Sequence, residues 1–193
     1  YLESRYFQVV SDPAWNRLVA GEAGRDLAAF DGAGTAFGPL REPRGLATDG
    51  HDRVFVADTG NDRVLVFRAV SEFDELRLEP LTVIDGLSAP WDVACSDGGT
   101  PLDDRDDRLY VADTGRNEVV RFSLSGGSAT RTGAIGGLGS GPGRFAGPLA
   151  LAVGRDGSTA TDDVYVADAH NGRLVHLRDD GSGLAWVGER RHE

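Results

Sequence analysis

The chain has 193 residues, of which 40% are hydrophobic and 26% charged, and this ordinary balance excludes a disordered chain. The formal net charge is −11, which repels nucleic acids, and no run approaches the roughly 18 apolar residues that a membrane-spanning helix needs. The single cysteine, Cys95, cannot form an internal disulfide, so the fold must depend on a hydrophobic core. We therefore expect neither nucleic acid as a partner nor insertion into a membrane.

The predicted strands, taken in chain order, begin with two short apolar runs at residues 6–10 and 17–21. Three longer units follow, each with four apolar runs separated by turns rich in Gly, Asp and Asn; they span residues 43–85, 90–136 and 148–188. The second run of each unit ends on an aspartate, and these residues, Asp58, Asp113 and Asp168, lie at a constant interval of 55 residues. The chain therefore consists of repeats, each of which predicts one four-stranded sheet.

The predicted strands carry apolar side chains on both faces. In the run at 54–57, Val54 and Val56 point to one side and Phe55 and Ala57 to the other. Such a strand is buried on both sides, which stacked sheets arranged in a ring would achieve. We therefore expect an all-β fold, a β-propeller of four-stranded antiparallel blades that is incomplete in this chain. A β-sandwich is the rival architecture, but it would not explain the constant interval.

Several motifs in these units resemble the NHL repeat family. The sequence P-x-G-L-A stands at 43–47, and V-A-D-T-G-N-x-R at 56–63 has counterparts at 111–118 and 166–173. Glycine-rich linkers that contain a Phe and a Pro lead into the first and third units. The resemblance implies a propeller that usually has six blades, of which this chain would supply about 3.5.

The incomplete blade count leaves two interpretations open. Residues 6–21 resemble the third and fourth strands of a preceding half blade. We favour a fragment of a longer propeller; the alternative is that another chain supplies the remaining blades. Since related bacterial NHL proteins are often exported, the resemblance favours a location outside the cytoplasm, periplasmic or secreted.

The repeated aspartates are predicted to have a structural role. The carboxylates of Asp58, Asp113 and Asp168 can accept hydrogen bonds from backbone N–H groups of the turn that follows each strand. Arg63 and Arg173 stand five residues further on, where each can form a partly exposed ion pair with the aspartate of its own repeat.

Metal ligation is not predicted by the remaining acidic and histidine residues. Acidic loops at 97–107 and 156–163 lack the alternating spacing of a calcium loop, so we interpret them as solvated loops, with calcium as a lesser alternative. The four histidines, His51, His170, His176 and His192, fall on separate elements and cannot together supply a zinc site. We expect no metal site and no cofactor.

Candidate binding residues are predicted from their position in a propeller. Turns between the second and third strands share one face with the linkers between blades, and the residue after each blade-opening proline lies near the central channel. The residues in these places are Arg44, Trp91, Leu149, Asn61, Arg116 and His170. Tryptophan and arginine on a polar face are typical of interface hot spots.

No catalytic constellation is evident in the sequence, so enzymatic activity is not the favoured reading. The sequence therefore favours a non-enzymatic NHL-repeat scaffold that binds a protein, peptide or glycan on this face. The alternative is part of a metal-dependent propeller lyase or lactonase-type hydrolase, with ligands on blades outside this chain. RNA binding, as in tripartite-motif NHL proteins, would require a basic face that a chain of charge −11 does not predict.

Overall fold

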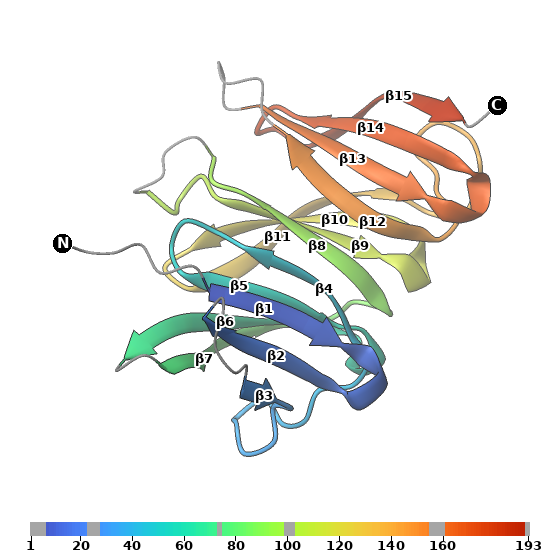
Figure 1. Cartoon of the computed structure of the whole chain (residues 1–193). Coiled ribbons are helices and arrows are strands. Elements are labelled where there is room, and N and C mark those ends of the chain that lie inside the picture. Colours follow the sequence, from blue (N-terminus) through green and yellow to red (C-terminus); the bar gives the residue numbers. More distant parts are fainter. Residues whose placement is uncertain (1–6, 23–27, 73–74, 99–102, 155–160, 192–193) are drawn as a thin grey trace.

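The fold is all-β, as the sequence predicts (Figure 1). The computed structural model describes residues 7–22, 28–72, 75–98, 103–154 and 161–191. Within these ranges the helices are single 3₁₀ turns of three residues, and none has the length or apolar character to cross a membrane.

Three antiparallel sheets of four strands form the body of the molecule, each with its strands in chain order. The first contains β4 (Pro43–Thr48), β5 (Arg53–Asp58), β6 (Arg63–Glu72) and β7 (Glu75–Ile84). The second contains β8 (Pro90–Ser96), β9 (Arg108–Asp113), β10 (Glu118–Ser125) and β11 (Ser128–Gly136). The third contains β12 (Pro148–Gly154), β13 (Asp162–Asp168), β14 (Arg173–Asp179) and β15 (Leu184–Arg191). The prediction of incomplete propeller architecture with four-stranded blades is confirmed.

The N-terminal sheet has three strands, and their identity corrects the sequence prediction. It consists of β1 (Phe7–Asp12), β2 (Arg17–Glu22) and β3 (Ala28–Phe30). Arg17 Nε donates to Asp12 Oδ2 at 2.9 Å, just as Arg63 Nε donates to Asp58 Oδ2 at 2.7 Å at the end of β5. β1, β2 and β3 are therefore the second, third and fourth strands of a blade, and only its innermost strand is lacking among the described residues.

The hydrophobic core lies between successive sheets, and each central strand contributes to two of its layers. Phe55 and Ala57 of β5 pack against the sheet of β8–β11, whereas Val54 and Val56 pack toward β2. The linkers add a buried apolar residue to each layer, namely Leu40, Leu87 and Phe145. The packing therefore confirms that β5 is buried on both faces, as its apolar side chains on both sides predict.

Buried ion pairs join neighbouring blades at the start of their second strands. Arg53 Nη2 donates to Asp107 Oδ2 at 2.5 Å, and Arg108 Nη1 donates to Asp162 Oδ2 at 2.9 Å. Both aspartates have no exposed surface, so the interpretation of their loops as solvated is wrong at these positions. Burial raises the pKa of Asp107 to about 6 although Arg53 faces it. Asp156, in the same predicted loop as Asp162, lies outside the described residues.

Candidate active site at the central channel

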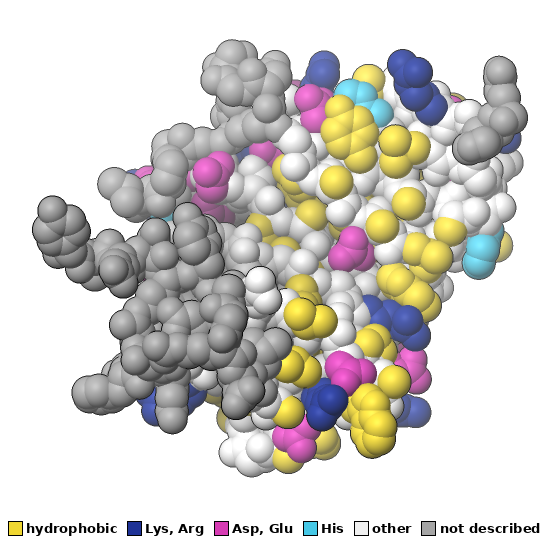
Figure 2. Space-filling model, viewed as in Figure 1, with side chains coloured by type: hydrophobic (Ala, Val, Ile, Leu, Met, Phe, Trp, Pro, Cys, Tyr) yellow, Lys and Arg dark blue, Asp and Glu magenta, His cyan; other side chains and the backbone are white. Residues whose placement is uncertain are grey.

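The innermost strands of the three complete blades lie side by side. β8 packs between β4 and β12, and Figure 1 shows the three strands as neighbours in the middle of the molecule. Each of these strands begins with a proline and has an irregular register at its first residues, where the chain enters the blade. Figure 2, drawn from the same side, shows hydrophobic side chains along this face with acidic side chains among them.

Asp92 places a carboxylate between these three strands. Its Oδ2 atom accepts a 2.8 Å hydrogen bond from the backbone N–H of Leu151 in β12. On the other side the carboxylate fills the space that Gly45 of β4 leaves open, because a Cβ atom on Gly45 would lie 2.2 Å from Asp92 Oδ1. Burial raises the pKa of Asp92, and its backbone hydrogen bonds only partly oppose this effect.

An aromatic and cationic pair precedes this carboxylate along the strands. The guanidinium of Arg44 stacks on the ring of Trp91, with Cζ 3.7 Å from the ring centroid. Arg44 Nη2 also donates to the exposed Glu42 at 3.3 Å, whereas Arg44 Nε is buried with no hydrogen-bond partner among the described residues. Leu149 takes the equivalent position in β12 and is half-buried. Arg44 and Trp91, two of the predicted binding residues, therefore form one unit that spans two blades.

Three other predicted binding residues lie on the turns of three different blades. Asn61 Nδ2 donates to Asp58 Oδ2 at 2.8 Å, and Arg116 Nη1 donates to Asp113 Oδ2 at 2.9 Å. Arg116 thus takes over in its repeat the contact that asparagine makes in the others. His170 is exposed on the last turn. The contacts of Asn61 and Arg116 stabilise their turns. His170 differs from them in taking no part in a contact with the repeated aspartate of its turn, where Asn171 donates instead.

The repeated aspartates tie each blade to the linker that precedes it. Asp58, Asp113 and Asp168 are fully buried, and their Oδ1 atoms accept 2.7 Å bonds from the backbone N–H groups of Arg41, Ser88 and Ala146. The sequence predicts donors in the turn that follows the strand. This prediction is wrong, because the linker folds back over the turn and supplies the donor from an earlier part of the chain.

The predicted pairs of Arg63 with Asp58 and of Arg173 with Asp168 are present, each with a Nε–Oδ2 distance of 2.7 Å. The side chain of Arg173 is completely buried, and its Nη1 atom also donates to the carbonyl of Ser140 at 2.7 Å. The expectation of a partly exposed pair is therefore wrong for Arg173, since the glycine-rich linker covers it.

The channel carboxylate was not among the residues predicted from the sequence. Asp92, Gly45 and Ala150 take equivalent places in the three repeats, so a carboxylate at a position otherwise held by Gly or Ala is the signal that could have found it. In the part of the chain that the structure describes, no three His, Cys, Asp or Glu side chains converge to hold a metal ion. The described residues alone therefore do not fit a metal centre.

A comparison with known protein families agrees with the motif and the fold. The family profile described as NHL repeat matches residues 40–67, which run from the end of the first long linker into the first half of β6. This chain carries an NHL repeat. No curated protein sequence matches the chain.

Solved structures of similar fold extend the comparison of this NHL-repeat chain. The periplasmic gluconolactonase of Pseudomonas aeruginosa is 19% identical with a TM-score of 0.57, and the similarity covers 94% of this chain and 52% of that one. A Bacteroides fragilis protein with a proposed 6-phosphogluconolactonase activity is 15% identical with a TM-score of 0.64, covering 95% and 54%. The virginiamycin B lyase of Staphylococcus aureus is 14% identical with a TM-score of 0.59, covering 100% and 54%.

These similarities correct the functional expectation. The NHL-repeat chain spans about half the length of each of these structures, and the likeness at such low identity is one of fold. The activities that these proteins are named for are those of lactonases and a lyase, and no finding supports a non-enzymatic scaffold. The scaffold interpretation is therefore wrong, and the enzyme alternative stands as a proposal.

Proposed function

We propose that this chain is part of a propeller enzyme that opens a lactone ring at the central channel. The observation that carries the proposal is the Asp92 carboxylate, which is held between β4 and β12 by Gly45 and the N–H of Leu151. A general base works best when its pKa lies near the operating pH, and burial moves the pKa of Asp92 upward in that direction.

The reaction needs a base and a surface for the ring. Asp92 accepts a proton from the water that attacks the lactone carbonyl carbon. The ring C–O bond then breaks, and this proton passes from Asp92 to the departing ring oxygen, so that a hydroxy acid forms and the Asp92 carboxylate is regenerated. The flat stack of Arg44 on Trp91 offers a face against which a ring can lie and a positive charge that favours the negative charge developing on the carbonyl oxygen.

A metal ion is not included in this proposal. The described residues offer Asp92 as the carboxylate between the inner strands, and further ligands would have to come from blades outside this chain. Elemental analysis of the whole protein for zinc and calcium tests for such an ion directly.

The experiment measures ring opening of an aldonolactone by the whole protein and by channel variants. We expect Asp92→Asn to lower kcat by about 100-fold or more, since it removes a general base. Trp91→Ala should act mainly on KM, because it removes binding surface. Asp180→Asn, in the exposed turn after β14, is the matched control and should retain full activity. Absence of lactone hydrolysis in the wild type, or equal kcat in Asp92→Asn, would overturn the proposal, and a lyase substrate would then be tested.

A further inference from the structure

Two equivalent aspartates lie at the interfaces between complete blades, and different numbers of hydrogen-bond donors reach them. Asp107 and Asp162 each stand six residues before the repeated aspartate of their blade, and neither has any exposed surface. The Oδ1 atom of Asp162 accepts a 2.6 Å hydrogen bond from the hydroxyl of Ser96. Its Oδ2 atom accepts bonds of 2.9 Å from Arg108 Nη1 and 2.7 Å from Tyr110 Oη. Donors therefore compensate both oxygens of Asp162.

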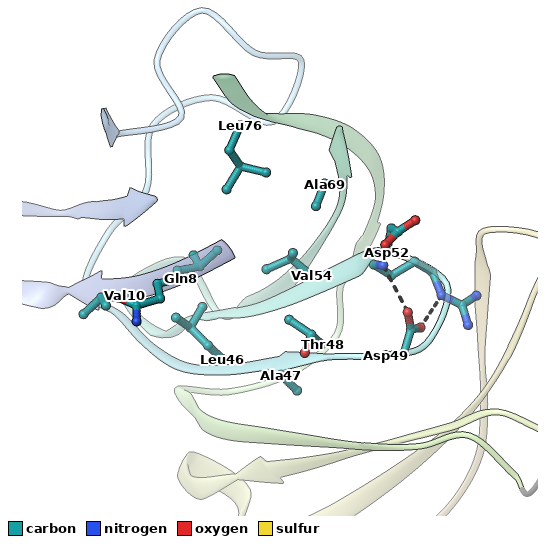
Figure 3. Close-up of a pocket in the computed structure, with 12 residues that line it drawn as sticks. Gln8, Val10, Leu46, Ala47, Thr48, Asp49, Asp52, Val54, Ala69 and Leu76 are labelled. Carbon is teal, nitrogen blue, oxygen red and sulfur yellow. Dashed lines mark hydrogen bonds and ion pairs between the residues drawn. The ribbon is translucent and has the colours of Figure 1, made fainter. Parts of the chain in front are cut away.

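The carboxylate of Asp107 lacks the two hydroxyl donors. Arg53 Nη2 donates to its Oδ2 atom at 2.5 Å, but its Oδ1 atom is buried without a hydrogen-bond partner among the described residues. Phe55 stands where the next repeat has its tyrosine, and Asp49 stands opposite Arg53 where the next repeat has its serine. Asp49 accepts from Arg53 Nε at 2.5 Å at the end of β4 (Figure 3), and an ionised carboxylate has no proton to donate.

Other charged and titratable groups surround Asp107 at the interface of the first and second complete blades. The Nε2 atom of His51, in the turn between β4 and β5, lies 3.5 Å from Asp107 Oδ2. The groups that face Asp107 are Asp49, His51 and Arg53 of the first blade, Asp104 and Asp106 of its own loop, and Cys95 of β8. Carboxylates dominate this cluster, so a negative charge on Asp107 is only partly compensated.

The ionisation of Asp107 is coupled to the stability of this interface. Burial raises the pKa of Asp107 to about 6, although Arg53 and His51 oppose this effect. The carboxylates of Asp49 and Asp106 raise the pKa further. An aspartate of the unfolded chain titrates near pH 4. Because the folded protein holds the proton to higher pH, the contribution of Asp107 to stability is fully present below about pH 4 and falls between about pH 4 and pH 6.

We propose that Asp107 and its neighbours form a pH-sensitive contact between the first and second blades, closed when Asp107 is protonated and loosened when it ionises. The contact lies at the end of β4 and β8 opposite Arg44 and Trp91, because those residues begin the strands and Asp49 follows the last residue of β4. A pocket of about 430 Å³ lies at this end, with Asp49 of the first blade and Ser96 of the second among its lining residues. Ionisation of Asp107 therefore changes how the two blades meet beside this pocket.

Amide hydrogen exchange of the whole protein at several pH values tests the contact. The N–H of Leu124 in β10 donates to the carbonyl of Asp107 at 3.0 Å, so its protection reports opening at this loop. The protection factor of Leu124, corrected for the intrinsic pH dependence of exchange, should fall about tenfold between pH 5 and pH 7.5. A protection factor that is unchanged over this range would overturn the proposal.

Three variants connect this fall to Asp107. Asp107→Asn imitates the neutral form and should abolish the fall, while Arg53 keeps its contact with Asp49. Phe55→Tyr supplies the hydroxyl that the second interface has, and it should make the fall smaller. Asp162→Asn is the matched control at the compensated interface; it should lower the urea midpoint of unfolding at every pH and leave the fall in place.

A fall that survives in Asp107→Asn, or that disappears equally in Asp162→Asn, would also overturn the proposal. The wild-type profile decides it even where a variant fails to fold. Since amide exchange reports the contact between blades and not turnover, its outcome is independent of the lactonase proposal.

Discussion

The second and third complete blades carry the same residue pattern on the sheet face that is turned toward the next blade along the chain. This face is covered in the second blade and partly exposed in the third. Tyr110 and Val119 are fully buried, because the sheet of β12–β15 and the linker residue Phe145 cover them. Their counterparts Tyr165 and Leu174 are 38% and 47% exposed. Each repeat therefore carries apolar side chains that only the neighbouring blade can bury, and this burial stabilises the interface between the two blades. Variants at matched positions of the blades test this difference.

The largest difference is expected for the aromatic residue of the second strand. Phe55→Ala in the closed layer should lower the free energy of unfolding by about 3–5 kcal/mol, because it leaves a cavity among packed side chains. Tyr165→Ala should cost less than about 1 kcal/mol in residues 1–193, since part of that ring already contacts water. Urea unfolding of the two variants measures both, and equal losses would contradict the comparison.

The interblade ion pairs should show the next largest effect. Arg108→Leu removes the partner of the buried Asp162 carboxylate and should destabilise the chain by about 3 kcal/mol. Arg105→Leu, which removes an exposed pair with Asp103, is the control and should leave the unfolding midpoint unchanged. Thermal unfolding compares the two. A neutral Arg108→Leu would mean that the buried pair is dispensable.

A smaller effect is expected from a single hydroxyl. Tyr110 Oη lies 2.7 Å from Asp162 Oδ2 and 2.8 Å from Asp179 Oδ2, and burial raises the pKa of this tyrosine above its usual value. Tyr110→Phe should cost about 2 kcal/mol, because buried carboxylates lose a hydrogen-bond partner. Tyr165→Phe, on the open face, should leave stability within about 0.5 kcal/mol. A loss of similar size in both would show that the hydroxyl of Tyr110 has no special role.

The fold was predictable because the same local sequence pattern occurs in each of the repeats. The constant spacing of the aspartates and the two-sided apolar strands such as β5 are sufficient to indicate stacked four-stranded sheets. The motif at Asp12 and Arg17 escaped recognition, since Pro13 and Trp15 replace the usual turn residues between them. Although the turn sequence differs, Asp12 and Arg17 form the same contact as the aspartate and arginine of the other repeats.

The candidate site was less predictable, because its contacts join residues of different repeats. The carboxylate of Asp92 is positioned by the space beside Gly45 and by a hydrogen bond from the N–H of Leu151, 59 residues further along the chain. The buried Asp107 likewise has its ion-pair partner, Arg53, in the preceding blade. Local pattern cannot show such partners. An aligned reading of the repeats, however, marks Asp92 as the exception at its position.

The smallest expected effect concerns pH and the open face. Asp163 takes the place that Arg108 has in the preceding repeat, and its Oδ1 atom lies 2.7 Å from His176 Nε2 and 3.2 Å from Arg178 Nε. The hydrogen bond from His176, followed by that from Arg178, lowers the pKa of Asp163. A lowered pKa in the folded state adds stability above the unfolded value near 4, and this contribution is lost as the pH falls. Because the pair is partly exposed, the contribution should be at most about 1 kcal/mol. Asp163→Asn should therefore flatten the acid side of the stability curve and lose its effect below about pH 3. Urea midpoints between pH 3 and pH 7 measure this, and a variant that diverges further from the wild type as the pH falls would show that the contacts of Asp163 do not stabilise the blade.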